Sequence, residues 1–317
     1  MRRERGLALI TAVFVVAIVA TVAAFLALGQ QIWIRQAQNF TDRAQGDAVA
    51  RGATAYALMV LRDDAKKNAA KDDYDEIWAK PIATPVEGGI GTGQITDAQA
   101  RFNLNSLVDA SGTYTPTQKP YADTFGRLLT HLSLDPDLKD AIIDWIDAND
   151  SAQGSGGAED VYYLTLDPPY RAPNRHMASI EELRLVKGFD AKTFETLAPY
   201  VVALEAPTAI NVNTADATVI GALFDTSPGN LDQVLASRKG QPFANVEELE
   251  TRSGATFAAD AKSAAGVTSN YFLLEAQTKF GRVNRGLRAL LKRDGNNVDV
   301  RWQRQLLPIP PKAQQQP

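Results

Sequence analysis

The chain has 317 residues, of which 45% are apolar and 22% are charged, and its formal net charge is −4. It contains no cysteine, which excludes disulfide bonds, thiolate catalysis and cysteine metal ligands. Its two histidines leave little material for histidine-based acid–base chemistry. The near balance of acidic and basic residues gives no general basic field, so we expect no nucleic-acid partner.

The N-terminal segment contains an uncharged run from Leu7 to Leu28, in which Thr11 and Thr21 are the only polar side chains. As a helix, this run is long enough to cross the hydrocarbon core of a bilayer. Three arginines precede it within residues 1–6. The positive-inside rule therefore predicts a cytoplasmic N-terminus, with the bulk of the chain on the other side of the membrane.

An amphipathic pattern continues directly from this run, over residues 29–62. Apolar and small residues recur at steps of three and four, and no proline occurs from Met1 to Ile77. The residues of this stripe are Trp33, Ala37, Phe40, Ala44, Ala48, Gly52, Tyr56 and Met59. We therefore expect one continuous helix of roughly fifty residues or more. A secretory signal peptide cut near Gly29 is the alternative, but its apolar region would exceed the usual length of about 7–15 residues.

The rest of the chain predicts an α+β body with a large helical domain inserted into it. Residues 81–93 are rich in proline and glycine and predict a loop, whereas residues 94–102 alternate like a strand. Strand patterns return only near the C-terminus, so we expect the early strand to join those strands in a small antiparallel sheet. The expected segments are a leader (1–6), a transmembrane helix (7–28), its amphipathic continuation (29–62), a first part of the body (63–107), a first helical unit with an acidic loop (108–206), a second helical unit (207–267), C-terminal strands (268–307, with strands at 271–280, 283–292 and 298–306) and a disordered tail (308–317).

A dense acidic cluster lies in the first helical unit, on a loop rich in glycine. Its oxygen-bearing side chains are Asp144, Asp147, Asn149, Asp150, Glu159 and Asp160. Carboxylates this close repel one another unless a cation or solvent screens them, and Ca²⁺ takes about six to eight such hard oxygen ligands. The spacing is not that of an EF-hand, because Ala152 stands where glycine is required and Glu159 comes one residue late. A solvated acidic loop without a metal is the alternative.

Residues 210–216 (INVNTAD), in the second helical unit, are similar to helix-hairpin-helix modules that grip DNA phosphates. Such modules need a glycine hairpin with free backbone amides, whereas residues 225–230 contain Asp225 and Pro228. We therefore expect a packing module and no phosphate site. Residues 88–93 are glycine-rich but lack the spacing of a P-loop or a dinucleotide fingerprint, and no nucleophile motif occurs, so we expect no enzyme activity.

The basic leader ending in Gly6, followed by an apolar helix that runs into an amphipathic one, resembles the type IV pilin and type II secretion pseudopilin class. This resemblance implies that prepilin peptidase cuts after Gly6 and methylates Leu7. It also implies a glutamate as the fifth residue after the cut, where this chain has Thr11. A carboxylate in hydrocarbon is costly unless it is paired, so a subunit with no neighbour to pair with does better with a neutral residue. The K subunit, placed at the fibre tip, is the member of the class that characteristically lacks this glutamate.

Longer phrases extend the resemblance to the K subunit over nearly the whole chain. They are DAQARFNLNSL (97–107), AIIDWIDANDSAQGSGGAEDVYYL (141–164), YRAPNRHMASIEELRLVKGF (170–189) and INVNTADATVIGAL (210–223). The resemblance implies a pseudopilin body interrupted by an α-domain of two SAM-like units that binds calcium. The implied ligands are Asp147, Asp150, Glu159 and Asp160, with Asn149 and Asp144 as further candidates.

The role implied by this resemblance is that of a non-enzymatic minor pseudopilin at the tip of the pseudopilus. It would initiate or cap assembly for the export of folded proteins from the periplasm across the outer membrane. The implied partners are the I- and J-type minor pseudopilins, the major pseudopilin, prepilin peptidase and the inner-membrane secretion platform. The implied location is the inner membrane, crossed once, with the bulk in the periplasm. The alternative is a periplasmic or secreted binding protein with a signal peptide and with calcium-binding and helix-hairpin-helix-like modules, and a membrane-anchored hydrolase has no supporting motif.

Overall fold

The computed structural model of the chain describes residues 2–68, 70–224, 231–254 and 256–306. Residues 225–230, which replace the expected glycine hairpin, and the tail 308–317, for which we expect disorder, lie outside the described residues.

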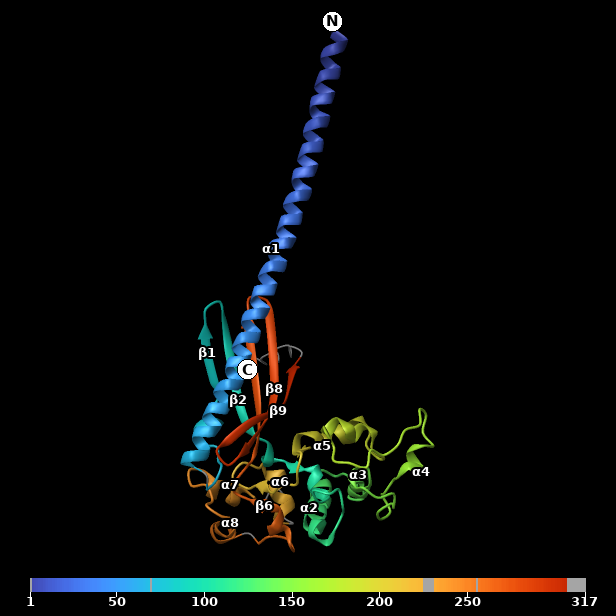
Figure 1. Cartoon of the computed structure of the whole chain (residues 1–317), viewed down its shortest axis with the longest axis vertical. Helices are drawn as coiled ribbons and strands as arrows, with labels where there is room; N and C mark the ends of the chain where they lie inside the picture. The colour runs from blue at the N-terminus through green and yellow to red at the C-terminus, as the bar shows by residue number, and fades with distance from the viewer. Residues whose placement is uncertain (1, 69, 225–230, 255, 307–317) are drawn as a thin grey trace.

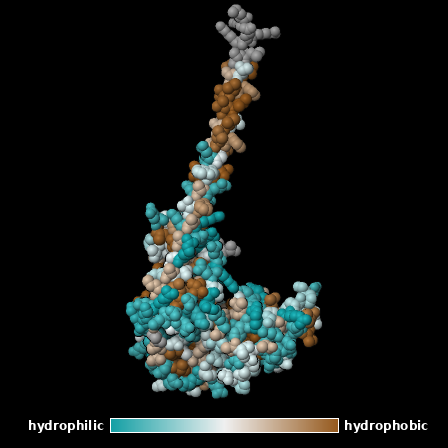
Figure 2. Space-filling view, viewed as in Figure 1, coloured by the Kyte–Doolittle hydropathy of each residue, from teal (hydrophilic) through white to brown (hydrophobic). Residues whose placement is uncertain are grey.

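One long helix, α1 (Arg2–Lys67), runs without interruption for 66 residues and confirms the expected continuous helix. At 1.5 Å per residue it is about 100 Å long. Its N-terminal half projects away from the rest of the molecule (Figure 1), and apolar side chains cover much of that projecting part (Figure 2). Within the described part of the chain, α1 is the one helix long and apolar enough to cross a membrane.

Local interactions within α1 satisfy polar groups near both of its ends. In the apolar run, the hydroxyl of Thr21 donates to the backbone oxygen of Ala17 at 2.8 Å, so this side chain exposes no unpaired donor to hydrocarbon. At the other end, Lys66 and Lys67 lie in the last turn, where cations interact favourably with the helix dipole. The helix ends five residues beyond the expected position.

The body is a five-stranded antiparallel sheet with the order β1-β2-β7-β8-β9. Its strands are β1 (Ile82–Val86), β2 (Gly89–Asp97), β7 (Tyr271–Phe280), β8 (Val283–Asp294) and β9 (Asn297–Leu306). The early strand does pair with the C-terminal meander, since β2 runs beside β7 from the Gly89–Phe280 pair to the Asp97–Phe272 pair. The small antiparallel sheet is therefore confirmed.

The loop expected at residues 81–93 is wrong, because the structure has a hairpin there, formed by β1 and the first half of β2. Pro85 is tolerated because β1 is an edge strand, where a missing N–H group costs no ladder bond. Gly88 supplies the positive φ, 77°, that the tight turn requires. The strand also ends earlier than expected, at Asp97, where a 3₁₀ turn, η2 (Ala98–Ala100), begins.

The C-terminal half of α1 covers one face of the sheet. Buried side chains of the helix such as Ala57 and Leu61 pack against Phe272, Leu274 and Leu291 of the sheet. Each fully buried Leu or Phe side chain contributes about 1.5–3 kcal/mol to stability. This buried face of α1 is not the stripe singled out in the sequence, which stays exposed.

The chain between β2 and β7 forms short helices joined by loops and packs around a further hydrophobic core, at the end of the molecule opposite the N-terminus (Figure 1). Its α-helices are α2 (Lys119–His131), α3 (Leu138–Ile146), α4 (Asp160–Tyr163), α5 (Ala191–Leu197), α6 (Ala217–Phe224), α7 (Asp232–Arg238) and α8 (Val246–Ser253). The 3₁₀ turns are η1 (Ile77–Ala79) before β1, then η3 (Leu104–Leu107), η4 (Pro116–Gln118), η5 (Ile180–Leu185), η6 (Ala198–Tyr200) and η8 (Ala261–Ala264). We call this region the inserted domain.

Two short parallel strand pairs bring the ends of each half of the inserted domain together. In the first half, β3 (Phe102–Asn103) pairs with β4 (Val201–Val202). In the second, β5 (Ile210–Asn211) pairs with β6 (Ala265–Gly266). The halves also contact each other, since Arg127 Nε of α2 donates to the backbone oxygen of Ala222 in α6 at 2.6 Å.

Candidate functional site

The acidic loop follows α3, and Asp144, near the end of that helix, holds the loop in place. Its buried carboxylate accepts hydrogen bonds from the backbone N–H groups of Gln153 (Oδ1, 2.9 Å) and Ala158 (Oδ2, 2.7 Å). A Cβ atom at Gly157 would lie 2.4 Å from Asp144 Oδ2, so this turn requires glycine. Burial raises the pKa of Asp144 to about 6. The main role of Asp144 is therefore to shape the loop.

Two further carboxyl groups are buried in the loop, with oxygen atoms that have no hydrogen-bond partner. Asp147 is fully buried and Glu159 is 6% exposed. The unpartnered atoms are Asp147 Oδ1 and both Oε atoms of Glu159. Burial and the neighbouring Asp144 raise the pKa of Asp147 to about 6. Burial, Asp144 and Asp147 together raise the pKa of Glu159 to about 7. Such oxygens are costly in a protein interior, and a hard cation would satisfy them.

Asn174 brings another unpartnered buried oxygen, Oδ1, to the same loop. Its Nδ2 donates to Asp150 Oδ1 at 3.0 Å, while Asn149 Nδ2 donates to Asp147 Oδ2 at 2.7 Å. Sequence reasoning missed Asn174 because it follows the acidic run at a distance and is uncharged. Its left-handed backbone, with φ of 46°, is a conformation that asparagine adopts more readily than most residues, but that is visible only in the structure.

The structure brings five of the six expected ligands together in one loop and turns the sixth away. The five are Asp144, Asp147, Asn149, Asp150 and Glu159. Asp160, the first residue of α4, forms an ion pair with Arg171 and accepts the backbone N–H of Ala172 at 3.1 Å. Arg171 already supplies a counter-charge for Asp160, so this carboxylate is the least suited of the six to bind a metal.

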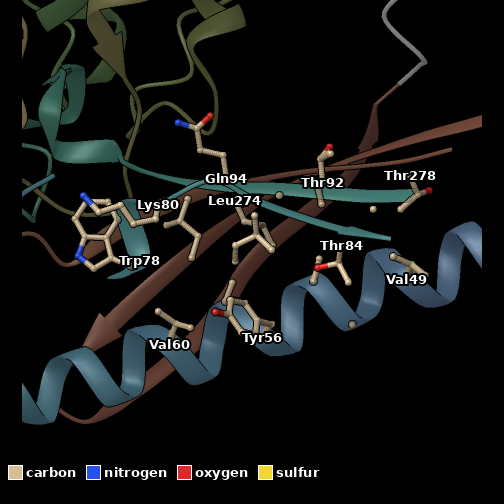
Figure 3. Close-up of a pocket in the computed structure, with 18 of the residues that line it drawn as sticks. Val49, Tyr56, Val60, Trp78, Lys80, Thr84, Thr92, Gln94, Leu274 and Thr278 are labelled. Carbon is tan, nitrogen blue, oxygen red and sulfur yellow. The ribbon is translucent and has the colours of Figure 1, made fainter. Parts of the chain in front are cut away.

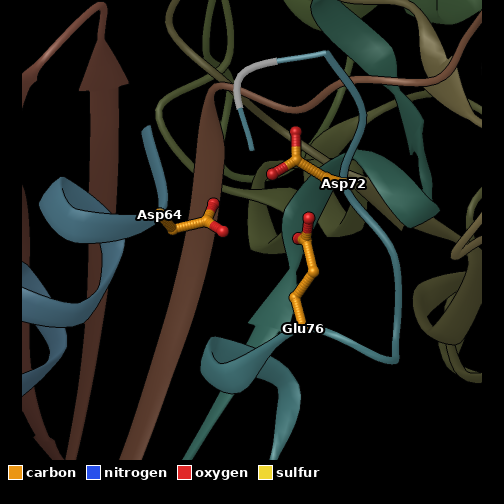
Figure 4. A group of neighbouring side chains, drawn as sticks. All are labelled: Asp64, Asp72 and Glu76. Carbon is orange, nitrogen blue, oxygen red and sulfur yellow. The ribbon is translucent and has the colours of Figure 1, made fainter. Parts of the chain in front are cut away.

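A second group of carboxyls, which the sequence did not indicate, lies where α1 meets the sheet. Oxygen atoms of Asp64, Asp72 and Glu76 lie within 4.8 Å of one another, and the three side chains point toward a common centre (Figure 4). Among the described residues, no other acidic group brings three ligand atoms so close. Arg293 of β8 neutralises it, because Nη1 donates to Asp64 Oδ2 and Nη2 to Asp72 Oδ1, both at 2.7 Å. We call these four residues the carboxylate junction.

The carboxylate junction has its own counter-ion, and this argues for a structural role. Burial raises the pKa of Glu76 to about 8 and that of Asp72 to about 6, the latter against the opposing effect of Arg293. A protonated Glu76 beside one guanidinium and two carboxylates leaves little net charge for a metal to neutralise. A buried ion pair of this kind specifies one arrangement of the elements that contribute to it.

Asp97, at the end of β2, connects the carboxylate junction to the inserted domain through hydrogen bonds. Its Oδ2 accepts hydrogen bonds from Thr214 Oγ1 at 2.6 Å and from Asn211 Nδ2 at 2.8 Å. Asn211 Nδ2 also donates to the backbone oxygen of Asp72 at 3.0 Å. Burial raises the pKa of Asp97. The end of α1, the sheet and the second half of the inserted domain therefore share one buried polar network.

The exposed face of α1 is the second candidate site. Trp33 is 70% exposed and Phe40 is 75% exposed, and the face continues through small residues to Tyr56 and Met59. A Cβ atom at Gly52 would meet nothing within 4 Å. We call this face the exposed stripe, which comprises Trp33, Ala37, Phe40, Ala44, Ala48, Gly52, Tyr56 and Met59. A continuous exposed apolar face of this kind marks an interaction site.

Side chains that would bind phosphate or act as bases in other proteins are engaged in packing here. Arg238 Nη1 of α7 donates to the backbone oxygens of Val212 at 2.9 Å and Ala215 at 2.6 Å. A ring nitrogen of His176 lies 3.0 Å from the backbone oxygen of Asp109. The contacts of Arg238 agree with the expected packing module in the second half of the inserted domain, whereas His176 packs within the first half.

Comparison with known proteins decides the family. Two family models match, at residues 100–206 and 210–268, and both describe type II secretion system protein K. Protein K of Pseudomonas aeruginosa is 33% identical over 306 residues, which cover 92% of this chain and 90% of that protein. The chain belongs to the protein K family of type II secretion systems. The protein K of Pectobacterium carotovorum is 31% identical and covers 94% of this chain and 95% of its own length.

A solved structure agrees with this family. It is a crystal structure of the GspK-GspI-GspJ complex from the type 2 secretion system of enterotoxigenic Escherichia coli, with a TM-score of 0.75 and 25% sequence identity. The match covers 86% of this chain and 100% of that one. The chain is thus a minor pseudopilin of a type II secretion system, a structural component with an N-terminal apolar helix. These relatives give no support to the alternative of a binding protein with a signal peptide.

Proposed function

We propose that this chain occupies the tip of the pseudopilus, with its exposed stripe packed against the helices of I- and J-type minor pseudopilins. The bulk and place of the inserted domain carry this proposal. The domain lies at the end of the molecule away from the N-terminus and extends well to one side of α1 (Figure 1). A subunit stacked above it along a fibre would meet this domain, so the chain would initiate or cap the fibre.

Two further observations support this arrangement. The related GspK was crystallised in a complex with GspI and GspJ, and the exposed stripe offers an apolar helix face for such partners. Position 11 carries threonine, a residue that needs no neighbouring amine to neutralise it in hydrocarbon. By the same logic, the major pseudopilin would lie below this chain, and the inner-membrane secretion platform would hold it before assembly. We also retain the proposal that the two halves of the inserted domain are SAM-like units.

Labelling of assembled fibres tests the tip position. The chain has no cysteine, so Val161→Cys, at a residue that is 84% exposed in the inserted domain, introduces a single reactive thiol. We expect a thiol-reactive gold label at one end of each pseudopilus, and label along the shaft would contradict the proposal. We also expect Thr11→Glu to give no gain in incorporation, and a variant that entered the shaft would count against tip placement.

We further propose that the chain is anchored in the inner membrane through Leu7–Leu28, with its bulk in the periplasm, after prepilin peptidase cuts behind Gly6 and methylates Leu7. The basic leader and the long apolar run support this. Mass spectrometry of the mature N-terminus is the test. A methylated N-terminal Leu7 that depends on prepilin peptidase supports the proposal, whereas a start near Gln30 would indicate a cleaved signal peptide.

We also propose that the acidic loop binds Ca²⁺. The orphaned oxygens of Asp147, Glu159 and Asn174 support the site, with Asp150 and Asn149 beside them. Asp144 holds the loop, and Asp160 would join the ligands only by leaving Arg171. When bound, the ion would supply the positive charge that the loop lacks. Glu159→Gln, developed in the Discussion, tests this proposal.

A further inference from the structure

An apolar groove of about 520 Å³ lies between α1 and the β1–β2 hairpin. Its floor is formed by buried side chains of the helix and the sheet, which include Ala57, Ile95 and Leu274. Figure 3 shows Tyr56, Val60, Trp78, Thr84 and Leu274 around the space between the helix and the strands. Among the described residues that line the groove, Lys80 is the only one with a charged side chain.

The groove exists because the hairpin touches α1 at one end and stands away from it elsewhere. At the contact, a Cβ atom on Gly91 would lie 2.7 Å from Val49 Cγ1, so glycine lets β2 reach the helix there. Beyond it, β1 is an edge strand that pairs only with β2 and overhangs the helix. The small side chains of Ala53 and Ala57 leave the space beneath unfilled.

We propose that this groove receives a large apolar side chain from the helix of a neighbouring minor pseudopilin. The inference rests on the proposed packing of such helices along the exposed stripe. Gly52 and Tyr56 belong to both features, since each is part of the stripe and lines the groove. A helix that follows the stripe therefore reaches the mouth of the groove, and Gly52 lets its backbone come close.

The position and chemistry of the groove favour a protein side chain over other occupants. Val49, the lining residue of α1 nearest the membrane segment, is 21 residues beyond Leu28, which is roughly 32 Å along a helix. An acyl chain of a surrounding lipid does not reach that far. A soluble small molecule needs a few convergent polar groups to orient it, and the buried floor offers apolar side chains. A buried aromatic or aliphatic anchor is the usual energetic centre of a protein interface.

Two matched pairs of variants of the full-length chain test the groove, one pair from each wall. Thr84→Trp fills the groove from β1, whereas Ala83→Trp places the same bulk on an exposed neighbouring residue that does not line it. Gly52→Leu fills it from α1, whereas Ala55→Leu lies on the same helix outside the groove. All four positions are exposed, so the variants should fold. The readout is the affinity for the detergent-solubilised I-type and J-type minor pseudopilins, measured separately.

We expect Thr84→Trp and Gly52→Leu to weaken binding of one of these partners at least about 30-fold, while the two controls stay near wild type. Equal effects of each variant and its control on partner affinity would refute the insertion of a partner side chain into the groove. Unchanged partner affinity with less co-purified phospholipid would assign the groove to lipid instead.

Cysteine crosslinking separates failure of the groove from failure of the proposed assembly. The chain supplies no background thiols, so Gly52→Cys and Ala44→Cys each report one position against cysteines scanned along the partner helix. Insertion into the groove is supported if Gly52→Cys and Ala44→Cys both form crosslinks to the partner helix. A partner residue that crosslinks to one of these positions should then also crosslink to Thr84→Cys. Crosslinks at Ala44→Cys alone leave the assembly in place and refute the groove. Crosslinks at neither position would refute the packing along the exposed stripe itself.

Discussion

The sharpest test of the acidic loop is Glu159→Gln, which removes one charge and keeps the shape of the side chain. In the folded chain, burial and the neighbouring Asp144 and Asp147 raise the pKa of Glu159 from 4.5 to about 7. The folded state therefore holds this proton more tightly than the unfolded state does. Stability from this group is highest below about pH 4.5 and falls as the pH rises to about 7. The raised pKa corresponds to a loss of about 3 kcal/mol above pH 7.

The variant should therefore be more stable than the wild type in EDTA at pH 8, although it removes a charged residue from a folded protein. We expect a gain of up to about 3 kcal/mol, which corresponds to about 6–12 °C in the melting temperature of a domain of this size. At pH 4.5 the two proteins should differ little. The pH dependence separates the charge effect from the cost of burying an amide, which is the same at both pH values.

Added Ca²⁺ should reverse the order of stability. At about 1,000 times its dissociation constant, the ion stabilises the wild type by about 4.1 kcal/mol, which exceeds the advantage of roughly 3 kcal/mol that the variant has in EDTA, whereas a variant that lacks the Glu159 carboxylate loses most of that response. The measurement is thermal melting of the full-length chain at both pH values, in EDTA and in Ca²⁺. Glu195→Gln, at an exposed residue of α5, is the matched control and should leave the Ca²⁺ response unchanged. A Glu159→Gln variant that keeps the full response, or a wild type without one, would refute the calcium proposal.

Further predictions concern the contacts that hold α1 to the sheet. Arg293→Met leaves the carboxyls of the junction without their counter-ion, so it should cost about 3–5 kcal/mol at pH 8 by urea unfolding. The loss should shrink at pH 5, where those carboxyls take up protons, and an equal loss at both values would contradict the assigned charge balance. Gly91→Val should cost about 1–3 kcal/mol because its Cβ clashes with Val49. Gly52→Ala meets no neighbour and should stabilise the helix by about 1 kcal/mol, so destabilisation there would show an unexpected contact.

The sequence predicted the long helix and the C-terminal strands. The continuous α1 follows from an apolar run and an amphipathic stripe with no proline between them, and the three C-terminal strands follow from strand-like segments, the last two joined by the turn signal at residues 294–297. The β1–β2 hairpin was missed because Pro85 and the four glycines at 88, 89, 91 and 93 resemble loop composition. An edge position and a close approach to α1 are what make those residues suitable for strands, and both are tertiary features.

The candidate sites also include residues that the sequence indicated and residues that only the fold brings together. The carboxylates of the acidic loop are near one another in sequence, so their pattern was visible, whereas Asn174 reaches them through a later turn of the chain. The carboxylate junction was invisible because Arg293 is separated from Asp64 by most of the chain. The direction of the exposed stripe could not be read from the sequence either. Small and apolar residues serve equally well against a sheet or a partner helix, and only the packing of Ala57 and Leu61 shows which face is already covered.

The two acidic groups of this chain contain similar residues, but only the carboxylate junction includes a basic side chain that pairs with its carboxylates. This difference favours the acidic loop as the site that suits a metal. By distance alone the carboxylate junction is the better cluster, because its three oxygens lie within 4.8 Å of one another. However, Arg293 donates to two of its carboxylates, and with Glu76 protonated little net charge is left for a metal to neutralise. In the acidic loop, no Lys or Arg among the described residues forms an ion pair with Asp147 or Glu159, and Asp147 Oδ1 and both Oε atoms of Glu159 have no donor. The protein supplies no basic side chain for these two carboxyls, and for this reason we propose a cation at the acidic loop and none at the tighter carboxylate junction.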